Sequence, residues 1–172
     1  MVLTRLALVV VILFGGSATL FAYGRSDAWV PQSNSRFGFT FSYPADIFQV
    51  ERSAGDGSGM AFVSTDGTAR MLVGGLENRD DFTLESYRSF IRDKSYSNFN
   101  VHYAPRGHSW FVLSGETAER VFYEKVIFGC GGRIINSFAL IYPVRSKAIF
   151  DPIVERLEDS FRIAKDCARY GY

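Results

Sequence analysis

His102 and His108 are the only histidines of the chain, and a Pro-Arg-Gly turn between them could bring them together. A zinc site needs three or four His, Cys or carboxylate ligands, and alternation along the strand predicts that His102 points to solvent. A Ser, His and acid set can be written from Ser114, His108 and Glu116, but no Gly-x-Ser-x-Gly elbow surrounds the serine. We therefore predict no catalytic residue, no cofactor and no metal, with the two histidines as weak metal candidates.

The glycine-rich segment 55–59 could hold a phosphate through its backbone amides. Phosphate-binding loops lead into a helix, whereas this segment leads into an apolar strand pattern, so we expect a hairpin loop. Asp56, Gly57 and Gly59 of this loop, together with Trp110, are the candidates for a docking or ligand surface, because exposed aromatic residues mark interfaces. The alternative for Trp110 is ordinary packing beneath a helix.

Cys130 and Cys167 are the only cysteines. In an exported protein two cysteines pair more often than they stay free, and a bridge between them would stabilise the fold by roughly 4 kcal/mol through loop entropy. Two buried thiols are the alternative, because the sequence does not give the Cα separation. No base lies beside Cys130 in the run Gly-Cys-Gly-Gly, so a catalytic thiol is not predicted.

The first 24 residues are typical of a secretory signal, with one arginine, an almost wholly apolar run over residues 6–21, and a small-x-small triplet. Cleavage could follow Gly24 or Ala28. The apolar run is also close to the length that spans a bilayer, so an uncleaved membrane anchor is the alternative. We expect an exported protein, periplasmic or secreted, or alternatively one anchored in the inner membrane with its domain outside.

The composition fits one ordinary domain. The chain has 172 residues, of which 47% are hydrophobic and 22% are charged, and the formal net charge is +1. This composition excludes an intrinsically disordered protein and a small disulfide framework. The evenly scattered charge gives no reason to expect nucleic acid or an anionic membrane surface as a partner.

Alternating apolar residues predict an antiparallel sheet of about six to eight strands. The run 37–43 places four aromatic rings on one face of the first strand, and an Asp-Gly pair at 66–67 predicts a tight hairpin. Phe99, Val101 and Tyr103 are expected on one face of a later strand. Four sequential strands with glycine-bearing turns indicate a meander. The expected strands are 37–43, 47–50, 60–64, 69–74, 99–103, 108–114, 120–128 and 133–142.

Two segments have helical periodicity. Residues 83–94 are expected to form an amphipathic helix of about three turns, with Thr83 as its N-cap. A second helix is expected from Ser146, with Pro152 in about its first turn and Glu158 paired with Arg162 one turn later. Helices that bury one stripe each against a sheet predict an α+β domain. The charged residues of this helix are expected to face water, namely Asp151, Glu155, Glu158, Asp159 and Arg162.

The opening Phe-Thr-Phe-Ser-Tyr-Pro at 39–44, the helix before a four-strand meander, and the closing residues 153–161 resemble the PsbP-like fold family. The Cys-Gly-Gly-Arg segment at 130–133 and the Tyr-Pro pair at 142–143 are similar to those of bacterial secreted proteins of unassigned role. The resemblance covers residues 37–162. It implies an α/β/α sandwich and a non-enzymatic docking subunit, as members in photosystem II and nuclear import are. Metal-binding residues described for some photosystem members have no counterpart in this chain.

These observations predict a signal peptide or hydrophobic anchor helix over 1–24, a linker over 25–36, a PsbP-like α+β domain over 37–165 and a C-terminal tail over 166–172. The expected function is an exported, non-enzymatic binding or docking module whose partner is another cell-envelope protein. A carrier of a small hydrophobic or aromatic ligand, held between sheet and helix, is the alternative, and an envelope hydrolase is the third. Membrane contact is expected only through an uncleaved N-terminus.

Overall fold

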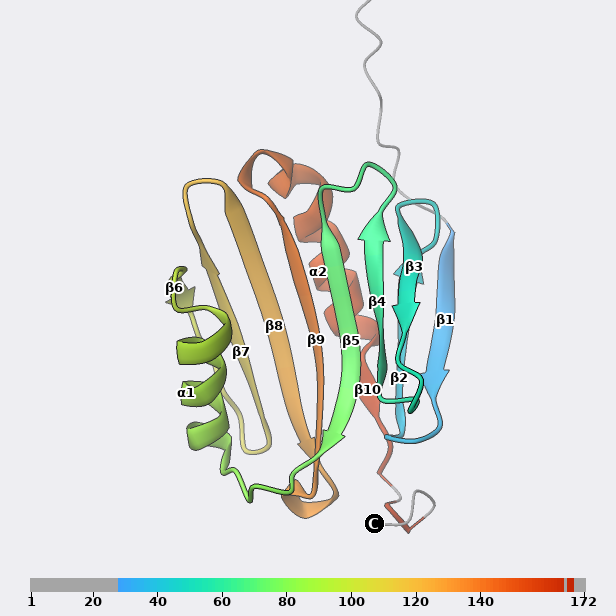
Figure 1. Ribbon diagram of the computed structural model, residues 1–172, viewed down its shortest axis with the longest axis vertical. Coiled ribbons are helices and arrows are strands. Elements are labelled where there is room, and N and C mark those ends of the chain that lie inside the picture. The colour runs from blue at the N-terminus through green and yellow to red at the C-terminus, as the bar shows by residue number, and fades with distance from the viewer. Residues whose placement is uncertain (1–27, 166, 169–172) are drawn as a thin grey trace, which may run out of the picture.

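A seven-stranded antiparallel sheet forms the centre of the protein, whose computed structural model describes residues 28–165 and 167–168 (Figure 1). The strand order is β3-β4-β5-β9-β8-β7-β6, so the consecutive strands β6 to β9 form the predicted meander. The predicted α+β class is therefore confirmed. The strands are β3 (Phe48–Ser53), β4 (Gly59–Ser64), β5 (Arg70–Glu77), β6 (Asn100–Tyr103), β7 (Trp110–Glu116), β8 (Arg120–Gly129) and β9 (Ile134–Pro143).

A second, smaller sheet was not predicted. It contains β1 (Trp29–Asn34), β2 (Phe39–Pro44) and β10 (Arg162–Ile163), with β2 in the middle. The sequence predicts a linker over 25–36, but residues 29–34 pair antiparallel with β2 along its whole length. The backbone of the buried strand β2 needs hydrogen-bond partners, and β1 supplies them along one edge. Pro31 does not prevent this pairing, because an edge strand tolerates a missing N–H.

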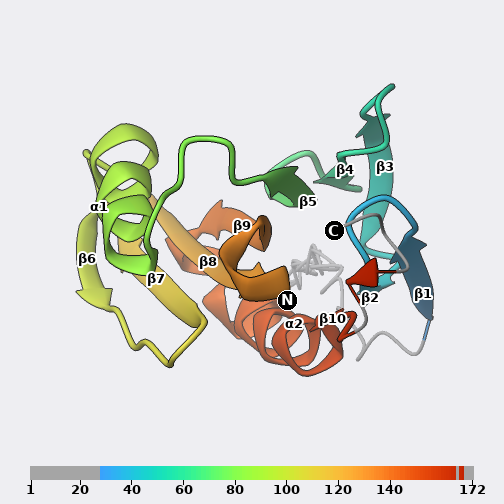
Figure 2. The ribbon, with the colours of Figure 1, turned by 90° about the horizontal axis from the view of Figure 1, so that it is seen from below.

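One helix lies on each face of the large sheet, as two views show (Figures 1 and 2). α1 (Leu84–Ser95) begins at the predicted cap, because the Thr83 side chain accepts a hydrogen bond from the backbone N–H of Ser86. α2 (Lys147–Ser160) follows a short 3₁₀ turn, η2 (Val144–Ser146). The layers are therefore α1, the large sheet, and α2 together with the small sheet, which is the expected sandwich.

Two hydrophobic cores fill the spaces between these layers. Because side chains alternate along a strand, neighbouring residues of β8 and β9 enter different cores. The core on the α2 side is rich in aromatic rings and includes Phe39, Phe41, Phe48, Phe62, Phe138, Phe150 and Phe161. The smaller core on the α1 side includes Tyr87, Ile91, Tyr96, Phe111, Leu113, Phe122, Val126 and Ile135.

The position of Tyr103 differs from the prediction. The pairing register of β6 with β7 shifts between Val101 and Tyr103, and such a bulge reverses the side of the strand that follows it. Val101 packs in the core under α1, whereas Tyr103 pairs with Ser114, whose row lies on the α2 side of the sheet. The prediction that the two residues share a face with Phe99 is therefore wrong.

The polar residues of α2 also differ from the prediction. Glu158 faces the sheet, where it accepts hydrogen bonds from Tyr123 and Lys125, and the Arg162 guanidinium bonds to backbone carbonyls instead of to this carboxylate. The cause is that α2 lies across strands that carry polar groups on this side. Pro152 falls in the second turn, because the helix begins at Lys147.

Cys130 and Cys167 form a disulfide, with Cα atoms 5.5 Å apart, so the predicted pairing is confirmed. The bridge joins the segment after β10 to the turn η1 (Cys130–Gly132), which connects β8 and β9. The predicted signal peptide or anchor, and most of the C-terminal tail, lie outside the described residues. Within the described ranges, no helix has the length and apolar character that a membrane span requires.

Candidate docking surface

The α1 side of the large sheet is only partly covered. α1 packs on β7 and β8, and Ile135 of β9 belongs to the same core, while no helix among the described residues covers β4 and β5 on this side (Figure 1). Strand register places Ala61, Leu72, Leu76, Ala139 and Ile141 on this side of the sheet, and we call the surface that they form beside α1 the open face. Leu72 is 54% exposed and Leu76 is 41% exposed, although β5 is an inner strand of the sheet.

Helix α1 forms one wall of the open face. Its Arg88 side chain donates to the carbonyl oxygen of Ala104, just after β6, at 3.1 Å, so this flank of the helix faces the sheet edge. Phe90 lies on the opposite flank of the helix and is 45% exposed. Leu72, Leu76 and Phe90, three of the five large apolar side chains that are exposed in the described part of the chain, therefore border one surface.

A hollow of about 320 Å³ lies on the open face. Apolar atoms of the open face and the ring of Tyr96, at the C-terminal end of α1, form much of its lining. The sheet curves so that α1 and β3 flank this region (Figure 2). On the β3 side Arg70 pairs with Glu51 at 3.1 Å, whereas the Arg52 side chain has no partner among the described residues. An apolar floor with a charged rim is the usual composition of a protein interface.

A buried carboxyl group lies where α1 meets the open face. Glu124 of β8 is 8% exposed, and its carboxylate accepts hydrogen bonds from the Tyr96 hydroxyl at 2.8 Å and from Ser137. The Tyr96 ring stacks on Phe122, with ring centres 3.6 Å apart. Burial raises the pKa of Glu124 to about 7, because the two hydrogen bonds offset only part of the desolvation of the charge. Burial also raises the pKa of Tyr96, which keeps its hydroxyl a donor.

Trp110 lies on the α2 side of the sheet, away from the open face. It pairs in register with Ile127, which packs against the core on that side. The Lys125 ammonium lies 5.6 Å from the centre of the Trp110 ring and pairs with Glu158 at 2.7 Å. The Trp110 ring also lies against Gly107, where a Cβ atom would meet its Nε1 at 2.2 Å. This half-buried position fits the packing alternative better than a freely exposed docking ring.

The glycine-rich loop between β3 and β4 lies at the other end of the sheet from β7, with β5, β9 and β8 between. The β1–β2 turn holds this loop, because Arg36 pairs with Asp56 at 3.0 Å and the Asn34 amide donates to the Gly57 carbonyl at 2.8 Å. Gly59 packs against the β5 backbone, where a Cβ atom would collide. The structure therefore does not bring this loop together with the predicted tryptophan.

The residues considered for catalysis lie apart or have other partners. His102 and His108 are both exposed, and within the described ranges no three His, Cys, Asp or Glu side chains are placed to hold a metal ion. The Ser114 hydroxyl donates to a backbone carbonyl of β8 at 2.9 Å. Glu116 pairs with a lysine of α2. This geometry gives no support to a nucleophile activated by a histidine.

Sequence reasoning missed the open face and the buried Glu124. The signal for the open face was present, because Leu72 lies between the equally apolar Met71 and Val73, a pattern that indicates a strand with two apolar faces. Glu124 is a charged residue in an otherwise apolar strand, next to the oppositely charged Lys125. Adjacent residues of a strand point to opposite faces, so at least one of these two charges had to enter a core.

No protein-family model matches the chain, and no curated protein sequence matches it. Solved structures are similar to it. Cyanobacterial PsbP (CyanoP) from Synechocystis superposes with a TM-score of 0.61 at 16% sequence identity, over 83% of this chain and 96% of that protein. The Ran-binding protein Mog1p of Saccharomyces cerevisiae superposes with a TM-score of 0.58 at 12% identity, over 82% of this chain and 97% of that one.

These similarities concern the fold, because proteins at such low identity can share an architecture and differ in function. They extend over nearly the whole length of both solved structures. They agree with the order of layers described above, in which a seven-stranded sheet lies between α1 and α2. The chain thus has the PsbP-like fold, as its sequence resemblance implied.

Proposed function

We propose that the protein is an exported, non-enzymatic docking module that binds another cell-envelope protein through its open face. The observation that carries this proposal is the exposed apolar surface of Leu72 and Leu76, on the part of the sheet that no described helix covers, together with Phe90 of α1 beside it. Apolar side chains gathered on one exposed surface mark an interaction site. A partner that covers them removes their apolar area from water, which favours association.

The partner contributes an apolar helix flanked by acidic residues. A sheet face with small side chains such as Ala61 and Ala139 accepts a packed helix, as the neighbouring strands accept α1. From Arg70 to Leu76, β5 spans about 20 Å, which fits a helix of about 13 residues. Arg52 borders this face without a carboxylate partner among the described residues, so a complementary charge on the partner is negative.

Two further observations support the proposal. The disulfide favours export, because structural disulfides persist in oxidising compartments and are rare in the cytosol. The fold supports docking, since the yeast protein that shares it is a Ran-binding protein. The near-neutral charge of the chain favours a protein partner over nucleic acid.

Site-specific cross-linking tests the docking function. A photoreactive residue replaces Leu72 on the open face or, as the matched control, Val50, which is 48% exposed and pairs in register with Phe62, a residue of the core on the other face. We expect a discrete cross-linked protein from position 72 in the cells that produce the chain, and none from position 50. The Leu72→Lys variant should bind that protein about tenfold more weakly than the unmodified protein does.

The cross-linked peptide of the partner should be an apolar segment with acidic neighbours. Equal cross-linking from positions 72 and 50, or a partner that binds the Leu72→Lys variant as well as the unmodified protein, would show that the open face is not the docking surface. The substitutions at positions 72 and 50 replace exposed side chains, so each variant should keep the fold. An unchanged melting temperature checks this.

A carrier of a small hydrophobic ligand is the second candidate, and the hollow of about 320 Å³ favours it. This volume lies at the lower end of the range for small-molecule sites. The apolar fluorophore N-phenyl-1-naphthylamine tests it, because its emission rises in an apolar site. Trp110 would not report such a ligand, since it lies on the other side of the sheet. Emission that rises with the unmodified protein and not with Leu72→Lys would support a carrier.

A further inference from the structure

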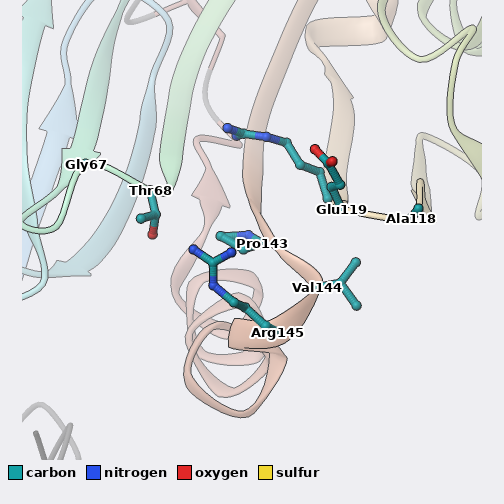
Figure 3. Close-up of a pocket in the computed structure, with 8 residues that line it drawn as sticks. Gly67, Thr68, Ala118, Glu119, Pro143, Val144 and Arg145 are labelled. Atoms are coloured by element: carbon teal, nitrogen blue, oxygen red, sulfur yellow. The ribbon is translucent and has the colours of Figure 1, made fainter.

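The open face ends at a second hollow that is lined by two arginines, Arg120 and Arg145; Figure 3 shows Arg145 with other residues of the lining. This hollow of about 670 Å³ lies among three turns at one end of the large sheet, formed by residues 67–68, 118–120 and 143–145. The backbone N–H of Val144 donates to the carbonyl oxygen of Glu119 at 2.8 Å. This hydrogen bond holds the two turns that carry the arginines in a fixed relation to each other.

The hollow continues the open face along the strands. Arg70 pairs in register with Ile141, and Arg120 pairs with Pro143. Pro143 lies two residues beyond Ile141 on the same side of β9, a distance of about 7 Å. A segment that lies along the open face therefore reaches this hollow with its next residues.

The side chains of Arg120 and Arg145 have no partner in the described part of the chain, unlike most arginines there. Several others pair with carboxylates, namely Arg36, Arg70, Arg79, Arg88, Arg92 and Arg106. Among the described residues, Arg52, Arg120 and Arg145 are the arginines whose side chains have no hydrogen bond, ion pair or ring contact. Arg120 and Arg145 line this hollow, which we call the arginine hollow, and Arg52 borders the open face.

The side chains around the hollow leave these guanidinium groups available. Arg145 extends past Pro143 on the side where Thr68 lies (Figure 3). Glu119 also lines the hollow, but it forms no ion pair with either arginine in the described part of the chain. The remaining lining is largely small or apolar, so the hollow combines positive charge with surface that the stem of an acidic side chain can contact.

We propose that Arg120 and Arg145 bind carboxylate side chains of the segment that docks on the open face; this inference rests on the docking function proposed above. A guanidinium group presents parallel N–H donors that match the two oxygens of a carboxylate. Two such groups on separate turns fit a pair of acidic residues at one end of the docked segment. The hollow thereby sets the direction in which the partner segment lies, with its acidic end at the turns and its apolar part on β5.

Arginine side-chain NMR tests the inference with a defined probe. The probe is a blocked tetrapeptide of alternating Asp and Glu, and its control is the matching tetrapeptide of Asn and Gln. We expect the acidic peptide to shift the Nε–Hε signals of Arg120 and Arg145, and the neutral peptide to leave them unchanged. The Arg120→Gln/Arg145→Gln variant should bind the acidic peptide about tenfold more weakly. The Arg106→Gln/Arg133→Gln variant, with the same change in charge at two positions outside the docking surface, should stay within about twofold.

Three results would overturn the inference. The first is an equal loss of affinity for the acidic peptide in the two double variants, which would show that the net charge of the protein attracts the peptide without a specific site. The second is the absence of any shift at millimolar peptide. The third is a shift caused by inorganic phosphate but not by the acidic peptide, which would show a site for a small oxyanion. Both pairs of arginines are exposed, and unchanged backbone spectra would verify that each variant is folded.

The peptide experiment and the test of the docking function give separate results. The Leu72→Lys substitution lies on the open face and should leave binding of the tetrapeptide unchanged while it lowers binding of the whole partner. If the peptide does not bind but Leu72→Lys still abolishes docking, the open face keeps its function and the arginine hollow loses its role. If the peptide binds but the partner is indifferent to Leu72, the docking function fails instead.

Discussion

The two faces of the large sheet are built from the same strands but are covered differently. On the α2 side, α2 and the small sheet together bury aromatic residues such as Phe138, which is 1% exposed. On the α1 side, the single helix α1 covers β7 and β8 and leaves Leu72 of β5 54% exposed. The described helices and the small sheet therefore cover most of one face and only part of the other. The apolar surface that remains exposed is therefore available for contact with a partner.

The largest expected difference between the faces concerns core truncation. Phe138→Ala should lower the free energy of unfolding by about 4 kcal/mol, because it opens a cavity among packed rings. Leu72→Ala should change it by about 0.5 kcal/mol or less, because its side chain is already exposed. Denaturant unfolding of both variants measures the difference. A Leu72→Ala cost close to that of Phe138→Ala would mean that the open face is buried within the protein in solution.

Two adjacent glycines of β5 test the same contrast at the backbone. A Cβ atom at Gly75, on the α2 side, would lie 2.4 Å from Asn136 Oδ1 and 2.6 Å from Phe37 Cβ. A Cβ atom at Gly74, on the open face, would meet its nearest atom, the Ser58 carbonyl oxygen, at 3.1 Å. Gly75→Ala should therefore destabilise the protein by about 3 kcal/mol through overpacking, and Gly74→Ala by about 1 kcal/mol or less.

Thermal unfolding followed by circular dichroism gives the order of these two glycine variants. If Gly74→Ala were the more destabilising substitution, the assignment of the two glycines to a closed and an open face would be wrong.

Much of this fold followed from side-chain alternation. The aromatic period of β2, the Asp-Gly hairpin and the Thr83 cap are local signals, and local physics decides them. Strand β1 could not be found this way, because its polar sequence gains its order by pairing with β2. The bulge that turns Tyr103 away from Val101 is likewise a matter of register with β7 and leaves no trace in the alternation of β6.

The candidate site was harder to predict than the fold, for a physical reason. The sequence shows that β5 is apolar on both sides, but not which side a helix covers, since that depends on where α1 lies across the sheet. The predicted docking residue Trp110 was chosen by type, and the structure surrounds it with Lys125 and Gly107. The exposed leucines of the open face are ordinary residues whose significance comes only from lacking a neighbour.

Glu124 and Lys125 are adjacent in β8 and point to opposite faces, so Glu124 is buried on the α1 side while Lys125 pairs with Glu158 on the α2 side. Burial raises the pKa of Glu124 from 4.5 to about 7. The folded state therefore holds this proton more tightly than the unfolded state, and the associated stability is complete below about pH 4.5 and lost as the pH rises through 7. We expect the free energy of unfolding to fall by up to roughly 3 kcal/mol across this interval.

Glu124→Gln should remove most of this pH dependence, because the amide is neutral at every pH and its oxygen can still accept from the Tyr96 hydroxyl. Guanidinium unfolding at pH 5 and pH 8, with the unmodified protein beside the variant, measures the change. A variant that lost stability toward pH 8 as steeply as the unmodified protein would rule out Glu124 as the cause.

The smallest expected effect is on the α2 side, at Glu158. Burial acts to raise the pKa of this carboxyl group, but the hydrogen bonds from Lys125 and Tyr123 outweigh it and lower the pKa. A lowered pKa contributes stability that is present above the unfolded pKa and is lost as the pH falls through the folded one, which is the reverse of the behaviour of Glu124. Because the Glu158 side chain is 34% exposed, solvent screening should keep its contribution below about 1 kcal/mol.

Glu158→Gln should therefore lower the free energy of unfolding slightly at neutral pH. In acid, where the Glu158 carboxyl group is protonated in any case, the variant and the unmodified protein should be equally stable. Glu155→Gln is the matched control, since Glu155 is exposed on the same helix and has no ion-pair partner in the described part of the chain. It should change stability at neither pH. If the Glu158→Gln variant kept full stability at neutral pH, the ion pair with Lys125 would contribute nothing measurable to stability. The contact with the Trp110 ring would then suffice to hold the Lys125 ammonium group, and the polar contact between α2 and β8 would direct packing without stabilising it.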